Sequence, residues 1–179
     1  MKKLIVLATF VCLIARVGVT AADSPKEVLN FKIGDDWKVA AHSDEHDSHS
    51  IIYIREGDDI DHWKERFSYL YGPRRRGLQS PDKEFNTLKR DMEKQWPGLT
   101  DWNVIAQDEN SILFEWHTAW SAQTHDEWNI LRIIHTKKNW FTLRYAARAH
   151  ELAPDTRAQW IKNFSDATVS DDSTASPER

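Results

Sequence analysis

The sequence predicts an α+β domain in which helices pack against an antiparallel β-sheet of about six to eight strands. Three observations support this fold class. One segment has a clear β-hairpin pattern, and one of its two strands is apolar on both faces. Predicted elements run in the order four strands, a helix, four strands and a last helix. Helices that are separated along the chain beside an antiparallel sheet are typical of α+β domains.

The hairpin pattern lies in Glu127–Ala147. Two runs rich in β-branched and aromatic residues, Glu127–His135 and Trp140–Ala147, are joined by four polar residues, which is typical of a hairpin. In the second run the apolar residues alternate with Thr142 and Arg144. The first run has apolar side chains on both faces, which predicts a central strand that is covered on each side.

Six further segments are predicted to be strands, most of them bounded by turn residues. Aromatic residues alternate with other types in Trp63–Tyr71, although a helix is the open alternative for that segment. The polar segment His42–Ser50 is expected to be a loop. The predicted strands are Val28–Ile33, Trp37–Ala41, Ser50–Arg55, Trp63–Tyr71, Trp102–Ala106 and Ser111–Trp120.

Two segments have helical periodicity, and we expect one helix on each face of the sheet. The first has Ser80 as N-cap and Pro81 at the first helical position, a typical helix start. Its apolar stripe consists of Phe85, Leu88, Met92 and Trp96. The second helix begins at Pro154, and its predicted stripe consists of Ala158, Ile161, Phe164, Ala167 and Thr168.

The N-terminus has the three parts of a secretory signal peptide. Met1–Lys3 is positively charged, Leu4–Ala15 is a twelve-residue apolar stretch, and Gly18–Ala22 supplies small residues for cleavage. Twelve apolar residues are too few for a membrane span, which needs about 20. We therefore predict a signal peptide over residues 1–22 and a secreted, periplasmic protein without a membrane anchor.

Loss of residues 1–22 would remove three of the 24 basic residues, leaving 21 against 28 acidic residues and a net charge of −7. Such an acidic chain is unsuited to nucleic acid or anionic membranes. The single cysteine would also leave, so a hydrophobic core must stabilise the mature chain without disulfides. We predict one domain over residues 27–169 and a disordered tail over residues 170–179, which are rich in Ser, Asp, Pro and Glu.

The order of elements resembles the PsbP-like fold, an α-β-α sandwich found in the extrinsic P subunit of photosystem II and in secreted bacterial proteins. The resembling stretch runs from Phe31 to Ala167. The resemblance implies a binding or accessory role rather than catalysis, and it supplies no site residues. It is carried most by Glu127, Leu131, Arg132, Ile133, Tyr145, Arg157, Trp160 and Phe164.

The segment His42–His49 is the richest in potential metal ligands, with three histidines and three carboxylates in eight residues. Imidazole and carboxylate groups bind zinc, copper and nickel. A structural zinc site, however, needs four ligands in fixed positions, which neighbours on a loop seldom supply. We favour a solvated hairpin tip and keep metal binding as an alternative. The candidate metal ligands are His42, Asp44, His46 and His49.

Arg74, Arg75 and Arg76 are candidate ligand-binding residues, because their forked donors could clamp a phosphate or a carboxylate. In an acidic protein such a run is more typical of an exposed loop, the interpretation that we favour.

Glu115 and His117 share one face of a predicted strand and could do acid–base chemistry. A cross-strand ion pair of Glu115 with an arginine such as Arg144 is the simpler interpretation. The remaining histidines lie near predicted element ends and are expected to be solvated. These are His62, His125, His135 and His150.

All nine tryptophans follow the predicted signal peptide, and their spread over most elements favours a core over an exposed aromatic platform. The sequence has no nucleophile elbow, phosphate loop, dinucleotide fingerprint or HExxH motif. We therefore expect a noncatalytic binding or accessory protein whose partner is a small molecule or an envelope protein. A metal-binding protein and a small hydrolase-like enzyme are the alternatives.

Overall fold

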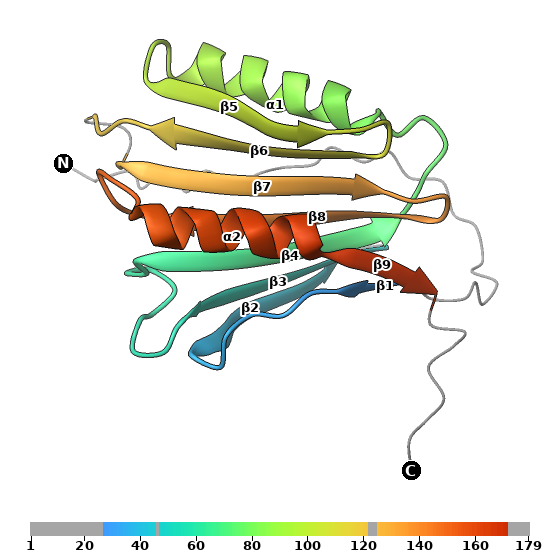
Figure 1. The fold of residues 1–179 in the computed structure, drawn as a ribbon, viewed down its shortest axis with the longest axis horizontal. Coiled ribbons are helices and arrows are strands. Elements are labelled where there is room, and N and C mark those ends of the chain that lie inside the picture. Colours follow the sequence, from blue (N-terminus) through green and yellow to red (C-terminus); the bar gives the residue numbers. More distant parts are fainter. Residues whose placement is uncertain (1–26, 46, 122–124, 172–179) are drawn as a thin grey trace.

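The structure is a computed structural model that describes residues 27–45, 47–121 and 125–171. The predicted signal peptide and residues 172–179 lie outside the described residues. The described elements are β1 (Glu27–Asn30), β2 (Trp37–Glu45), β3 (Ser48–Arg55), β4 (Glu65–Pro73), α1 (Pro81–Gln95), β5 (Thr100–Gln107), β6 (Ser111–Thr118), β7 (Glu127–His135), β8 (Asn139–Ala147), α2 (Pro154–Asp166) and β9 (Thr168–Asp171) (Figure 1).

Seven strands form one antiparallel sheet in the order β2-β3-β4-β8-β7-β6-β5 (Figure 1). The predicted hairpin is confirmed as β7 and β8, in which His135 lies opposite Trp140. Both strands are interior members of the sheet, as the apolar residues on both faces of β7 predicted. β1 and β9, at the two ends of the described chain, pair with each other as a separate two-stranded sheet.

The two helices pack on opposite faces of the large sheet. Trp160 and Phe164 of α2 pack against Leu113 of β6 in one core cluster. Phe85 of α1 packs against Phe114, the next residue of β6, in the other. Successive strand residues point to opposite faces, so the helices cover different faces. The α+β fold class is confirmed, with one helix on each side of the sheet.

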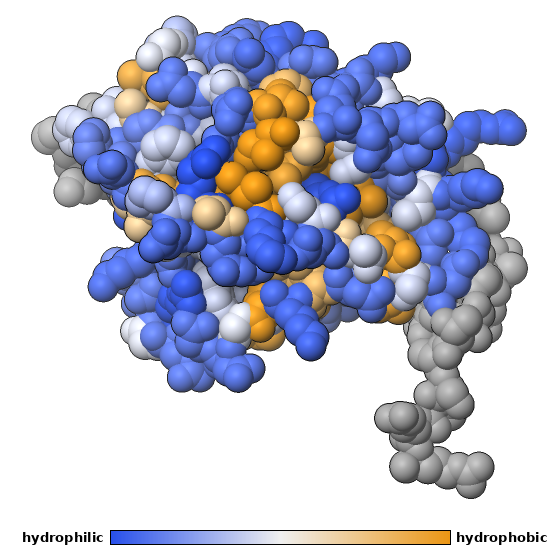
Figure 2. Space-filling model, viewed as in Figure 1, coloured by the Kyte–Doolittle hydropathy of each residue, from blue (hydrophilic) through white to orange (hydrophobic). Residues whose placement is uncertain are grey.

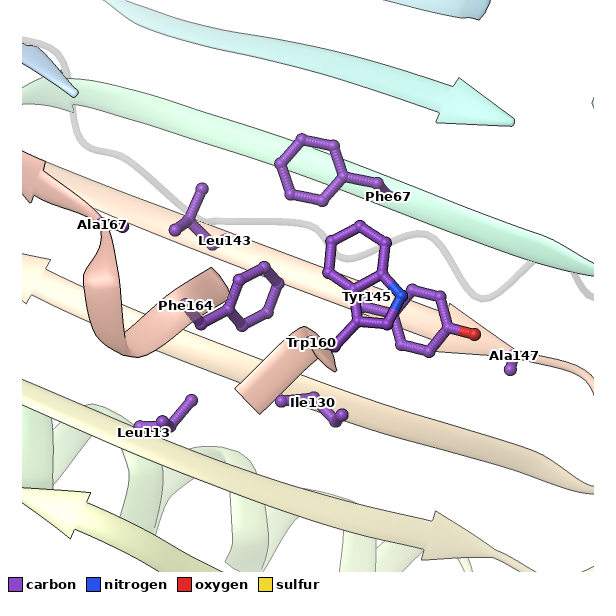
Figure 3. Packing of buried hydrophobic residues seen from close by; sticks show 9 residues of the cluster. All are labelled: Phe67, Leu113, Ile130, Leu143, Tyr145, Ala147, Trp160, Phe164 and Ala167. Carbon is purple, nitrogen blue, oxygen red and sulfur yellow. The ribbon is translucent and has the colours of Figure 1, made fainter. Parts of the chain in front are cut away.

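The core on the α2 face is built from stacked aromatic rings (Figure 3). The ring centroids of Trp160 and Tyr145 are 4.4 Å apart and nearly parallel, and those of Trp160 and Phe67 are 5.8 Å apart. The predicted stripe of this helix omitted Trp160 and included Ala158, which is exposed. Trp160 and Phe164, four residues apart on one side of α2, are the residues that this helix buries.

The prediction of a loop over His42–Ser50 was wrong, because residues 42–45 and 48–50 lie in strands. β2 continues to Glu45 and pairs with β3, which begins at Ser48, and Asp44 lies opposite His49. The segment is polar because β2 is an edge strand of the sheet. Edge strands need less apolar surface than central ones, and charged side chains there discourage pairing with other chains.

The predicted tail and the end of the last helix also differ from the structure. α2 ends at Asp166, and Thr168, which was expected on the helix, belongs to β9. Ser170 and Asp171 were assigned to the tail but lie in β9, where the amide of Asn30 donates a hydrogen bond to the Ser170 hydroxyl at 2.9 Å. Within the described residues, neither helix has the length and apolar composition needed to cross a membrane.

His135 was expected to be solvated but is only 3 % exposed. Its Nε2 lies 3.3 Å from the carboxylate of Glu84 on α1, because the helix covers this end of β7. The expectation holds for His62, His125 and His150, which are exposed.

Truncation of Phe164, which is 0 % exposed, tests the packing of α2. We expect Phe164→Ala to lower the free energy of unfolding by about 3–5 kcal/mol, because the change removes buried apolar contacts and leaves a cavity. Urea unfolding followed by tryptophan fluorescence measures this change. Val39, 58 % exposed, supplies the control, and Val39→Ala should change the same quantity by about 0.5 kcal/mol or less. Equal small effects of both changes would contradict the described docking of α2.

Candidate functional site

The pairing of β2 with β3 brings three of the candidate metal ligands together. Oδ1 of Asp44 lies 3.1 Å from His42 Nε2 and 2.5 Å from His49 Nδ1. The hydrogen bond from His49 contributes most to lowering the pKa of Asp44, and His42 adds to the effect. His49 also stacks on Tyr71, with ring centroids 4.6 Å apart. These contacts connect β2 and β3 near the end of the hairpin.

The fourth candidate ligand, His46, lies outside the described residues. Among the residues that the structure describes, no group of three His, Cys, Asp or Glu side chains has the arrangement needed to hold a metal ion. Both described imidazoles share one carboxylate oxygen of Asp44. Metal binding at this hairpin therefore stays a prediction.

The arginine run lies beside the hairpin but does not form a common clamp. Nη1 of Arg74 donates a hydrogen bond to the backbone oxygen of Thr136 at 2.7 Å. Nη2 of Arg75 lies 3.0 Å from the carboxylate of Asp47, and Arg76 is exposed. Arg74 and Arg75 thus bind two different turns of the protein, the role expected of a structural loop.

Glu115 and His117 do share a strand face, but each has its own structural partner. Both oxygens of the buried Glu115 receive hydrogen bonds from Arg157 of α2, at 2.7 and 2.5 Å, and Asn103 adds one at 2.8 Å. His117 lies 3.3 Å from Asp126 and stacks on Trp128. The ion-pair interpretation of Glu115 is supported, although the partner is Arg157 rather than Arg144.

A cleft of about 500 Å³ lies at the opposite end of the sheet from the histidine hairpin. It is bounded by the end of β3, the start of β4, the end of β8 and the N-terminal end of α2. Figure 2 shows that the face carrying α2 is largely hydrophilic around a central hydrophobic strip. Seven charged side chains line the cleft, and these are Arg55, Glu56, Asp58, Lys64, Glu65, Arg148 and Glu151.

A chain of hydrogen bonds runs from the core into this cleft. The hydroxyl of Tyr145 donates to Oε1 of Glu65 at 2.5 Å, and Nε of Arg55 donates to Oε2 of the same carboxylate. Arg55 also bonds Asp36 and lies 4.2 Å from the ring centroid of Trp37. Burial, followed by the hydrogen bond and charge of Glu65, raises the pKa of Tyr145. The tyrosine is therefore held as a hydrogen-bond donor.

This cleft has no signal in the sequence, because its residues come from separate parts of the chain. No tryptophan lines the described cleft. Trp63, Trp116 and Trp160 are buried, as a core role predicts, whereas Trp120 is 68 % exposed. The described cleft is instead lined by charged and small side chains.

No family model and no curated protein matches the sequence. Among solved structures, the chain is similar to LpqN, involved in cell envelope biogenesis of Mycobacterium tuberculosis. The TM-score is 0.46 and the sequence identity 11 %, and the similarity covers 83 % of this chain and 86 % of that chain. A likeness at this level carries no argument about function, and the resemblance to PsbP-like proteins remains one of pattern.

Because the pKa of Glu115 is shifted, the contribution of the Glu115–Arg157 pair to the stability of the fold depends on pH. Burial by itself raises this pKa, but the hydrogen bonds from Arg157 and Asn103 and the charge of Arg157 lower it overall. A carboxylate with a lowered pKa stabilises the fold above the ordinary glutamate range. That stabilisation is lost as the pH falls through the lowered value.

We expect Glu115→Gln to lower the free energy of unfolding near pH 7 by about 1–3 kcal/mol, because Arg157 loses its charged partner. The variant should also lose less stability than the wild type on acidification. Denaturant unfolding at several pH values from about 7 to 3 measures both effects. Glu45 is exposed on β2, so Glu45→Gln is the matched control. Identical pH profiles for the two variants would show that the pair does not support the fold.

Proposed function

We propose that the protein is a secreted, noncatalytic binding or accessory protein whose cleft beside the N-terminal end of α2 takes a small polar molecule. The observation that carries this proposal is the hydrogen-bonded chain of Tyr145, Glu65, Arg55 and Asp36 at the cleft. It holds charged groups in fixed positions beside an open volume of about 500 Å³.

The size and rigidity of the cleft favour binding. Ligand pockets commonly have volumes of about 300–1,000 Å³ and carry a few well-placed polar groups. Tyr145 is 0 % exposed and is fixed by its stacking on Trp160. Side chains that are already ordered lose little conformational entropy when a ligand arrives. The lining carries both signs of charge, which suits a small molecule with acidic and basic groups.

The hydrogen bonds of Glu65 and Tyr145 favour binding over proton transfer. Glu65 accepts hydrogen bonds at both oxygens, and the raised pKa of Tyr145 keeps its proton in place. The hydrolase alternative depended on Glu115, whose oxygens are occupied by Arg157. A general base must reach the proton that it takes from its substrate, whereas each of these carboxylates already binds an arginine of the protein.

The proposed location rests on the N-terminal sequence. Its positive, apolar and small-residue segments have the layout of a signal peptide, which directs a protein out of the cytoplasm. We therefore place the protein in the periplasm, with a free small molecule as its first partner and an envelope protein as the alternative.

A bulky residue in the cleft tests this proposal. Ala149 lines the cleft, so Ala149→Trp should block it, whereas Ala158→Trp adds the same side chain to the exposed side of α2. Thermal unfolding is measured with amino acids, monosaccharides and short carboxylic acids. We expect at least one compound to raise the Tm of the wild type and of Ala158→Trp, but not that of Ala149→Trp, because only a bound ligand stabilises the fold by mass action.

Equal Tm increases in all three proteins would place the binding elsewhere, and the absence of any increase would count against a small-molecule ligand of these classes.

The histidine hairpin supports metal binding as a second candidate function, because two imidazoles converge on the carboxylate of Asp44. Calorimetric titration with zinc, copper and nickel tests it. Under this hypothesis the wild type binds one of these ions, and changing His42, His46 and His49 to alanine abolishes the binding. Equal heats for both proteins would refute it.

A further inference from the structure

The sheet face that carries α1 has an arginine, Arg66, that forms no ion pair with the described residues. Arg66 of β4 projects from this face, opposite Ala146 of β8. α1 packs against β5, β6 and β7, so it does not extend over β4. No carboxylate among the described residues lies within ion-pair distance of Arg66, and its buried Nε has no hydrogen-bond partner.

Two more arginines, Arg144 and Arg148, lie near Arg66, and the carboxylate of Glu127 forms an ion pair with the first of them. Nη2 of Arg144 lies 2.9 Å from Glu127. The guanidinium carbons of Arg66 and Arg148 lie 4.5 and 4.2 Å from the ring centroid of Trp63. Burial, and then the positive charge of Arg144, lower the pKa of Arg66 to about 10; the charge of Glu127 opposes this shift, and Arg148 adds a smaller decrease. The cluster is therefore a positive region in a protein whose net charge is −4.

The strand register places further unpartnered donors beside Arg66. Arg66 lies opposite Ala146, Ala146 opposite Asn129, and Asn129 opposite Trp116. These four residues form one row across β4, β8, β7 and β6, on the same face. Asn129 is 1 % exposed and its Nδ2 has no partner, and Nε1 of Trp116 is likewise unpartnered. Every unpartnered polar atom in this row is a donor.

Arg132 shows how this protein provides hydrogen-bond acceptors for an arginine with a structural role. It lies on the α2 face, where it donates to the hydroxyl of Ser111 at 3.0 Å and to the backbone oxygen of Ala167 at 2.9 Å. It also bonds the backbone oxygen of Phe164. A buried donor without a partner destabilises the folded state. The unpartnered donors of Arg66, Asn129 and Trp116 therefore lack the kind of acceptors that the protein supplies to Arg132.

We propose that the row of Arg66, Asn129 and Trp116, which we name the donor row, binds the oxyanion of a small molecule, a carboxylate or a phosphate. An oxyanion has only acceptor atoms, and two parallel hydrogen bonds from a guanidinium group suit it well. Arg144 is already neutralised by Glu127, so Arg66 supplies the charge. This site goes beyond the cleft described above, since the donor row lies on the other face of the sheet.

Replacement of Arg66 tests anion binding separately from the stability of the fold. We expect Arg66→Met to have a Tm no lower than that of the wild type, because apolar replacement of a buried charge is often neutral or stabilising. Inorganic phosphate or acetate, compared with chloride at equal ionic strength, should raise the Tm of the wild type with increasing concentration. In Arg66→Met we expect the affinity inferred from this rise to be at least tenfold weaker.

Arg76→Met removes the same charge from the exposed loop and should keep the full response to the anions. Arg66→Lys retains the charge without the planar fork, and its weaker response provides a second reading should the methionine variant fail to fold.

A response to phosphate alone, to acetate alone or to both supports the proposal and identifies the class of oxyanion. A response that is equal in the wild type and in both Arg66 variants overturns it, as does a response lost in Arg76→Met alone. The absence of any response to either anion also overturns it and leaves ordered water as the partner of these donors.

Discussion

The stacking of Trp160 on Tyr145 is the contact on which both the core and the cleft depend. The ring of Tyr145 belongs to the buried cluster that holds α2 on the sheet. Its hydroxyl leaves that cluster and bonds Glu65 at the cleft. Any shift of α2 would therefore move the hydroxyl and with it the Glu65–Arg55 pair. The docking of one helix thus sets the positions of polar groups that lie outside the core.

The buried polar groups discussed above differ between the two faces of the sheet in their number of hydrogen-bond partners. On the α2 face, Glu115 and Arg132 have several hydrogen-bond partners each, and most come from α2 or from the residues that follow it. On the α1 face, Arg66 and Asn129 retain donors without partners. Because buried donors normally have partners, the unpartnered donors of Arg66 and Asn129 make the α1 face a candidate for ligand recognition in addition to the cleft beside α2.

Local patterns in the sequence predict the elements of the fold but not the positions of its polar side chains. The hairpin of β7 and β8 and the start of α1 follow from alternation and from Ser80–Pro81, signals contained within a few residues. The extension of β2 to Glu45 has no such signal, because an edge strand can be polar on both faces. β9 is equally difficult to predict, since among the described strands it pairs with β1, at the other end of the described chain.

The candidate sites depend on register, which a single sequence does not reveal. Arg66 and Asn129 lie in one row of the sheet only because β4 and β7 both pair with β8, where each lies opposite Ala146. A slip of one residue in either pairing would send one of the two side chains to the opposite face. Arg74, Arg75 and Arg76 are candidates in the sequence because they are adjacent. In the structure, however, Arg74 and Arg75 form hydrogen bonds with two different turns. Adjacency in the sheet, rather than in the chain, therefore decides which arginines can act together on an anion.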